Sequence, residues 1–186
     1  MDDEQFIKDY LERYKQSLFE TDVSILMIQM KEMLLGVKKD DQKVIVAGNG
    51  GSAAMASHVS VDFTKQGGIR TVNFNESDLI TCFANDYGYE NWLAKSIEFY
   101  IDPGDVVVLI SSSGSSKNMV NAAKYAKTHG YKVITFTGFN NNNQLKKEGY
   151  LNFWVDSRAY NIVENTHQIW LLTACDLIIG KAEYSA

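Results

Sequence analysis

The sequence predicts a doubly wound α/β domain, with about five parallel strands, preceded by a helical hairpin. Short apolar runs rich in β-branched residues recur along the chain, and helical stretches separate them. These runs lack the alternation of a half-exposed strand, which is typical of a parallel sheet covered by helices on both faces. Clusters of glycine or serine follow two of the runs, as at the strand-to-helix turns of flavodoxin-like and Rossmann-like sheets.

The first part of the chain predicts the hairpin. Apolar and aromatic residues recur there at helical spacing, beginning with Phe6 and Tyr10. The Thr21-Asp22 pair offers capping chemistry in the middle of this stretch, so we expect two helices. Apolar stripes of this kind are typical of a core or a subunit interface. We therefore expect residues 1–40 to form an oligomerisation hairpin and residues 41–186 to form the main domain.

From residue 41 onward, predicted strands and helices alternate. Strands are expected at residues 43–47, 70–74, 105–110, 132–136 and 150–155. Helices are expected at residues 53–65, 78–84, 89–100, about 117–129 and 161–180. The Asn140–Asn143 run, which follows Gly138, predicts a solvated loop.

Composition narrows the function. With 18 basic and 23 acidic residues, the formal charge of −5 opposes direct nucleic-acid binding but allows a local anion site. Neither a membrane span nor a signal peptide is expected, because no apolar run is long enough and the first residues are acidic. Cys82 and Cys175 are far apart and lie among apolar residues, which predicts reduced, buried thiols in a cytoplasmic protein.

Two loops carry the predicted binding chemistry. Ligands of an open parallel sheet bind outside the carboxyl ends of its strands. Residues 48–52 follow the first predicted strand, residues 111–116 follow the third, and both lead into helix N-termini. Backbone N–H groups and serine hydroxyls there favour an anion without any basic side chain. The two loops together predict a site for phosphate or a phosphorylated sugar.

A dinucleotide site is the competing interpretation of the first loop. Gly48, Gly50 and Ala53 fit the fingerprint G-x-G-x-x-A. The acidic residue that the fingerprint wants about 20 residues later would be Glu76, which lies 28 residues after Gly48. Because this acid is late and the serine loop stays unexplained, we expect no nucleotide cofactor.

Three segments together resemble the SIS (sugar isomerase) domain family and, within it, the phosphoheptose isomerases. They are AGNGGSAAMASHVSVDFTK, ANDYGYEN and ISSSGSSKNMVNAAKYAKTHGYKVITFTG, and the resemblance covers roughly residues 40–180. It implies the SIS fold and a homotetramer with sites between subunits. It also implies an isomerase that interconverts aldose and ketose phosphates, such as sedoheptulose 7-phosphate and its heptose isomer, through an enediol.

The resemblance also implies which residues bind the substrate. It assigns the phosphate to the serine loop, at Ser111, Ser112, Ser113 and Ser116. It assigns contacts with sugar hydroxyls to Asn49, Gly50, Ser52 and Asp86. Which sugar phosphate is bound is not specified by these residues.

The reaction needs a base beside the reacting carbon and groups that stabilise the enediolate. His58 and Asp62 are four residues apart, so they share one helical face. They could bind a metal or act as base and orienting partner, and an ordinary capping or interface pair is the alternative. Members of the family carry a Glu four residues after this His, as base and zinc ligand. The resemblance therefore implies that Asp62 is the base, with a side chain shorter by one methylene.

The C-terminal helix departs from the family pattern. Members usually show Arg-Ile-Gln-Glu there and a His eight residues after the Gln, which complete the zinc site. In this chain Glu164 takes the place of the Gln and Leu172 takes the place of the His. Leucine neither binds a metal nor transfers a proton, so the resemblance leaves the zinc site incomplete. A non-catalytic sugar-phosphate sensor or interaction scaffold is the alternative function.

A substitute site is possible on the same helix. Glu164 and His167 are three residues apart and could meet His58 and Asp62 across an interface. Two histidines and two carboxylates suit zinc or a similar divalent ion, so catalytic roles and a zinc site formed by His58, Asp62 and Glu164 remain predictions. The alternative for His167 is a hydrogen-bonded interface histidine.

Overall fold

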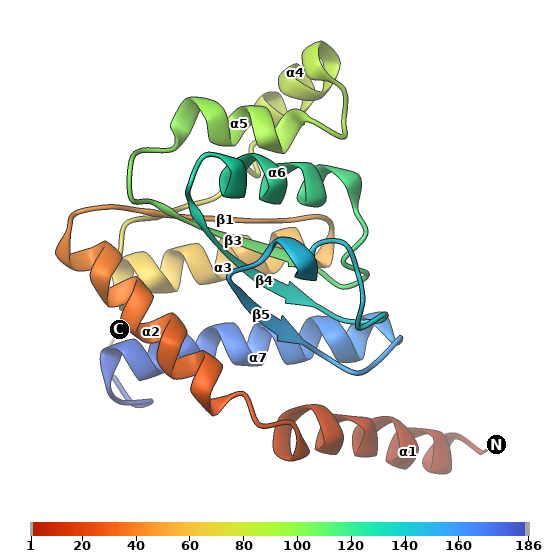
Figure 1. The fold of residues 1–186 in the computed structure, drawn as a ribbon. Coiled ribbons are helices and arrows are strands. Elements are labelled where there is room, and N and C mark those ends of the chain that lie inside the picture. Colours follow the sequence, from red (N-terminus) through yellow and green to blue (C-terminus); the bar gives the residue numbers. More distant parts are fainter. Residues whose placement is uncertain (1, 185–186) are drawn as a thin grey trace.

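A computed structural model describes residues 2–184 and has three layers, with helices on both faces of one sheet (Figure 1). The sheet has five strands in the order β2-β1-β3-β4-β5, and every neighbouring pair is parallel. The strands are β1 (Val44–Gly48), β2 (Thr71–Val72), β3 (Val106–Ser111), β4 (Lys132–Thr137) and β5 (Leu151–Trp154). The predicted doubly wound α/β class is confirmed.

The helices of the main domain also lie where the sequence predicts them. They are α3 (Gly51–Lys65), α4 (Ser77–Tyr87), α5 (Trp92–Tyr100), α6 (Lys117–Thr128) and α7 (Tyr160–Ile179), with a short 3₁₀ turn at Lys146–Glu148. The strand predicted at 70–74 shortens to the two residues of β2. This strand lies at the edge of the sheet, and its two residues pair with Val44 and Ile45 at the start of β1.

The two-sided core explains why the strands lack alternation. Val44 and Val46 of β1 pack on the face covered by α2, α3 and α7. Ile45 and Ala47 pack on the opposite face, with side chains of α5 and α6. Successive side chains of a strand point to opposite faces, so a strand buried on both sides must be apolar throughout.

The two N-terminal helices pack differently, and they do not fold back on each other as the predicted hairpin would (Figure 1). The predicted break near Thr21 is confirmed, because α1 (Asp3–Lys15) passes through a π-helical turn (Gln16–Glu20) before α2 (Ser24–Lys39) begins. Helix α2 buries four apolar side chains in the core of the main domain, whereas α1 buries none and projects away from the body (Figure 1).

Two local predictions are corrected. The Asn140–Asn143 run is not wholly solvated, because Asn143 is only 4% exposed and its amide donates to the Thr137 hydroxyl and the Asn140 carbonyl. Of the two cysteines predicted to be buried, Cys175 is buried and Cys82 is exposed.

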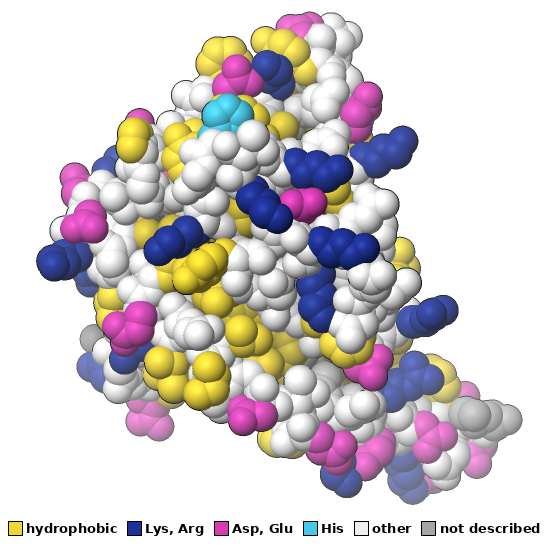
Figure 2. Space-filling view, viewed as in Figure 1, with side chains coloured by type: hydrophobic (Ala, Val, Ile, Leu, Met, Phe, Trp, Pro, Cys, Tyr) yellow, Lys and Arg dark blue, Asp and Glu magenta, His cyan; other side chains and the backbone are white. Residues whose placement is uncertain are grey.

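The surface carries charges of both signs. On the face seen in Figure 2, basic and acidic side chains stand among neutral ones, so the charge of −5 does not gather in a single acidic patch there. Within residues 2–184, no helix has both the length and the apolar character that crossing a membrane requires.

Candidate functional site

The two predicted loops meet at the carboxyl edge of the sheet. Strands β1 and β3 are neighbours, and Gly48 is in register with Ile110, so both loops leave the sheet at the same level. A pocket of about 120 Å³ opens between them and the start of α7. The pocket is lined by Asn49, Ser52, Ile110, Ser111, Ser112, Ser113, Ser116, Tyr160 and Glu164.

The lining of this serine pocket suits an anion. None of its nine described lining residues is Lys or Arg, and the donors are hydroxyls, an amide and backbone N–H groups. Ser116 is the N-cap of α6 and Gly50 that of α3, so two helices begin at the pocket with their positive dipole ends. Pockets that enclose a whole small molecule measure about 300–1,000 Å³, so this pocket fits one end of a ligand.

Glycines allow the close approach of these loops. Gly114 has a φ of +62°, and a Cβ atom there would overlap the Asn143 side chain. A Cβ atom at Gly51 would overlap the carboxylate of Glu164. Asn143 thus supports the serine loop from the turn after β4, and α7 packs directly on the start of α3.

The structure brings most of the predicted binding residues together. Six of them line the serine pocket, namely Asn49, Ser52, Ser111, Ser112, Ser113 and Ser116. Glu164, predicted as a catalytic and metal-binding residue, lies in the same pocket, with its Oε1 3.5 Å from the Ser112 hydroxyl. Gly50 lies in the loop but does not line the pocket.

Asp86 lies outside the serine pocket. It is an exposed residue of α4, and it lines a separate cavity with Cys82, Phe83 and Tyr87. Within one chain, the sugar-hydroxyl contact predicted for Asp86 is therefore not part of the same pocket as the serines.

The His58–Asp62 pair lies on the seam between α3 and α7. The Nε2 atom of His58 is 3.3 Å from Oδ2 of Asp62, as expected for two residues on one helical face. On its other side, Nδ1 of His58 is 3.3 Å from the Gln168 amide nitrogen. If Nδ1 accepts from that amide, the ring proton is on Nε2 and points at Asp62. The His58 side chain is 56% exposed and that of Asp62 26%.

Cys175 lies in the core near this seam. Burial raises the pKa of its thiol to about 11, and the negative charges of Asp62 and Asp176 add to this effect. The thiol is therefore protonated at neutral pH, so it supplies neither a thiolate ligand nor a nucleophile beside Asp62.

His167 is buried in the core, apart from that pair. Its ring is fully buried, Nε2 lies 3.0 Å from the Thr137 carbonyl oxygen, and the ring packs edge-on against Phe136. Burial lowers the pKa of His167 to about 4, and the bond to Thr137 offsets this only in part. A neutral histidine that donates inside the core does not fit the catalytic role, the metal-ligating role or the interface position predicted for it.

The predicted metal ligands do not assemble within one chain. Among residues 2–184, no three His, Cys, Asp or Glu side chains are grouped so that they could hold a metal ion. His58 and Asp62 are in contact, whereas Glu164 faces the serine loop. One chain therefore offers two protein ligands at the seam, which is fewer than zinc sites in proteins use.

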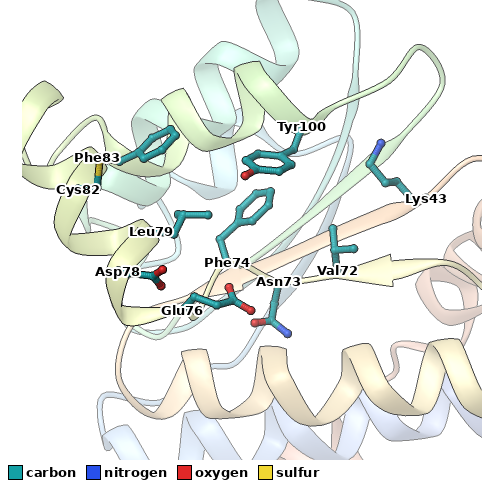
Figure 3. A pocket seen from close by; sticks show the side chains of 10 residues that line it. All are labelled: Lys43, Val72, Asn73, Phe74, Glu76, Asp78, Leu79, Cys82, Phe83 and Tyr100. Carbon is teal, nitrogen blue, oxygen red and sulfur yellow. The ribbon is translucent and has the colours of Figure 1, made fainter.

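A larger cavity of about 650 Å³ lies elsewhere, between β2, α4 and the end of α5 (Figure 3). Its walls are largely aromatic and acidic, with Phe74, Phe83, Tyr100, Glu76 and Asp78. Lys43 also lines it, but its ammonium group is paired with the carboxylates of Asp102 and Asp105. This cavity suits a phosphate poorly, because two carboxylates would repel it and its described lining includes no serine or threonine hydroxyl.

Sequence reasoning missed four residues of the site. They are Tyr160, which lines the pocket, Asn118, which bonds Asn49, Asn143, which supports Gly114, and Gln168, which faces His58. Asn118 ends the segment SSSGSSKN, so its place beside the serine loop could have been found. The other three depend on contacts between segments far apart in the chain.

Known proteins match this chain over most of its length. The family model described as "SIS domain" matches residues 8–138. The phosphoheptose isomerase of Thermodesulfovibrio yellowstonii is 31% identical over 89% of this chain and 85% of its own. The probable phosphoheptose isomerase of Thermoplasma acidophilum is 34% identical over 94% of this chain and 98% of its own.

Solved structures of phosphoheptose isomerases are also similar to this chain. A phosphoheptose isomerase structure from Neisseria gonorrhoeae has a TM-score of 0.84 and 29% identity, covering 94% of this chain and 98% of that chain. One from Francisella tularensis has a TM-score of 0.88 and covers 97% of this chain and 100% of that chain. The identity with the latter is 24%, so that likeness concerns the fold.

Proposed function

The chain belongs to the SIS domain family, and from this premise we propose that it is a phosphoheptose isomerase. It interconverts the ketose and aldose forms of a heptose phosphate, with sedoheptulose 7-phosphate as the ketose, by moving a proton between C1 and C2 through an enediol. The observation that carries this proposal is the serine pocket, which holds anion donors from two loops at the carboxyl edge of the sheet.

The serine pocket would hold the phosphate. Hydroxyls of Ser111, Ser112, Ser113 and Ser116 and the first N–H groups of α6 would donate to its oxygens. Asn49, Gly50 and Ser52 would contact the phosphate or the nearest sugar hydroxyls from the other loop.

The spacing along α3 supports Asp62 as the base. Helix α3 begins at the pocket, and its rise places His58 about 9 Å beyond Ser52 along the axis. An extended seven-carbon sugar with its phosphate in the pocket spans a comparable length. Helical side chains tilt toward the N-terminus, so Asp62 points back to His58 and toward the sugar. Asp62 would remove the proton, and His58, whose Nε2–H points at that carboxylate, would hold Asp62 in position.

The two remaining carboxylates have different proposed roles. Glu164 lies in the serine pocket, where its carboxylate would accept hydrogen bonds from sugar hydroxyls next to the phosphate. Asp86 would contact sugar hydroxyls in the site of a neighbouring copy, because in its own chain it lies on α4, outside the pocket.

A homotetramer, joined in part by residues 1–40, completes this proposal. Support comes from α1 and the turn after it, where Phe6 is 57% exposed, Leu11 60% and Phe19 83%. Apolar side chains as exposed as these favour burial against another copy. The two unpaired cysteines are consistent with a place in the cytoplasm.

Zinc binding at the His58–Asp62 pair is a separate proposal. One chain offers His58 and Asp62 at the seam, and Leu172 stands where members of the family have a histidine. A zinc ion there would need further ligands from a second copy or from water. The acid–base roles above need no metal.

The test is turnover of sedoheptulose 7-phosphate, followed by NMR, with and without added zinc. We expect the heptose isomer to form and a proton from solvent to appear at the reacting carbon. Saturable binding without turnover of any heptose, hexose or pentose phosphate would contradict the proposed isomerase activity. It would favour a non-catalytic sugar-phosphate sensor. Turnover that requires zinc would support the completed metal site, whereas equal turnover in the presence of a chelator would contradict it.

A further inference from the structure

We propose that Asn118 is a positioning residue, which fixes the Asn49 amide in the serine pocket and thereby couples the two ligand-binding loops. This inference rests on the proposed phosphosugar site. Asn118 does not line the pocket, so it would act only through Asn49.

The two asparagines form a closed pair of hydrogen bonds. Nδ2 of Asn49 donates to Oδ1 of Asn118 at 3.0 Å, and Nδ2 of Asn118 donates to Oδ1 of Asn49 at 2.8 Å. Asn118 is 2% exposed, so water does not compete for its amide. The pair joins segments 69 residues apart in the chain, and the buried Asn118 amide holds the more accessible Asn49 amide in place.

The bonding capacity of Asn49 shows what is left for a ligand. Its oxygen accepts from Asn118 and also from the Tyr89 hydroxyl at 3.4 Å, which uses both lone pairs. Its nitrogen has two hydrogens, and one is taken by Asn118. The remaining N–H is free to donate, so the pair makes Asn49 a donor to an oxygen of the phosphate or the sugar.

The place of Asn118 in the fold makes this pair a link between the loops. Asn118 lies in the first turn of α6, two residues after the N-cap Ser116, whose hydroxyl is 3.4 Å from that of Ser111. Asn49 lies directly before Gly50, the N-cap of α3. An anion that orders the start of α6 therefore also orders Asn49, and the phosphate would help to align the sugar-binding loop.

A double-mutant cycle tests this coupling. Asn118→Ala, Asn49→Ala and the double variant are compared with wild type for kcat, KM and the affinity for sedoheptulose 7-phosphate by calorimetry. We expect Asn118→Ala and Asn49→Ala each to lower kcat/KM about tenfold. If Asn118 acts through Asn49, the double variant falls no more than about twofold below Asn49→Ala. Independent, multiplying losses would overturn the proposal.

Two further variants separate positioning from a structural role. Asn118→Leu keeps the side-chain size and should repeat the loss seen with alanine. Asn152→Ala removes a partly buried amide on β5 that bonds the Thr135 hydroxyl and the Gly149 carbonyl, and it should leave kcat/KM within about twofold of wild type. If neither Asn118→Ala nor Asn118→Leu shows a cooperative thermal unfolding transition, Asn118 is required for folding and the proposal is wrong.

The cycle also distinguishes this proposal from the function on which it rests. If wild type binds sedoheptulose 7-phosphate without turnover, the isomerase assignment fails, and the same cycle on affinity still decides the role of Asn118. Absence of binding by wild type overturns both.

Discussion

The serine pocket and the His58–Asp62 pair share helix α3 but differ in what one chain provides. The pocket is closed by two loops and α7, and its Ser111 and Ser112 are buried. The pair lies on the half-exposed seam between α3 and α7, where the Gln168 amide contacts Nδ1 of His58. Anion binding comes largely from backbone and loop geometry, which a single chain can build, whereas proton transfer depends on a few side chains at the surface.

This difference has a measurable consequence. Changes in the pocket should weaken substrate binding, and changes on the seam should slow turnover without weakening it. The predictions below test that separation, from the largest expected effect to the smallest.

The largest effect is expected from Asp62→Asn. Loss of a general base costs about 10²- to 10⁴-fold, so kcat should fall by about a thousandfold while affinity for sedoheptulose 7-phosphate stays near that of wild type. Proton exchange at C1 and C2, followed by NMR, is the direct readout. Asp78→Asn on α4 is the matched control and should leave kcat unchanged. Unchanged turnover in Asp62→Asn would remove Asp62 from the mechanism.

Acidification should destabilise the core that supports both regions. His167 has a folded-state pKa of about 4, below its ordinary value of 6.5. Between these values the unfolded chain binds a proton that the folded chain does not, so stability falls as pH falls through this window. The loss from this group is on the order of 3 kcal/mol between pH 7 and pH 4.

The measurement is urea unfolding at several pH values. His167→Gln should lower stability at pH 7 and flatten its dependence on pH between 7 and 4. His129→Gln, at the exposed C-terminal end of α6, is the control and should keep the wild-type slope. Equal slopes for wild type and His167→Gln would contradict a neutral buried ring.

Gly114→Ala tests the pocket alone. The substitution forces a side chain into a positive φ and against Asn143, which should cost about 1–3 kcal/mol and weaken phosphate binding about tenfold. Gly130→Ala is the matched control, because Gly130 also has a positive φ but nothing lies within 4 Å of the added atom. It should lower the melting temperature and leave phosphate affinity unchanged. If both variants bind phosphate as wild type does, the serine loop is not the anion site.

The smallest effect is expected from Gln168→Ala. It removes the amide beside Nδ1 of His58, and a hydrogen bond of about 1 kcal/mol corresponds to a roughly fivefold lower kcat. KM should not change. Thr173→Ala removes an exposed hydroxyl from the same helix and should have no effect on either constant. A rise in KM without loss of kcat would place Gln168 with the pocket.

The sequence predicted what depends on local pattern. Strands β1 and β3 and their glycine and serine loops are visible because apolar runs and turn residues are neighbours in the chain. The shared face of His58 and Asp62 follows from helical spacing alone. The asparagine run predicts a solvated loop, but the turn after β4 brings the Asn143 amide to the Thr137 hydroxyl and the Asn140 carbonyl, which the sequence pattern does not reveal.

Helical residues show the same limit. The pattern placed His167 and Glu164 on one face, yet α7 turns His167 toward β4 and Glu164 toward the serine loop. The apolar neighbours of Cys82 predict burial, but α4 packs mainly on α5 and leaves the thiol exposed. Which side of a helix is covered depends on its neighbours, and these come from distant parts of the sequence.

The lack of cationic side chains in the described lining of the serine pocket determines how binding responds to ionic strength. At a basic patch, added salt screens the attraction and weakens anion binding. The described lining of this pocket contains no cationic side chain, and the nearest formal charge is the carboxylate of Glu164. Screening therefore has little attraction to remove and some repulsion to relieve, so the affinity for a sugar phosphate should be maintained, or rise slightly, as the salt concentration increases.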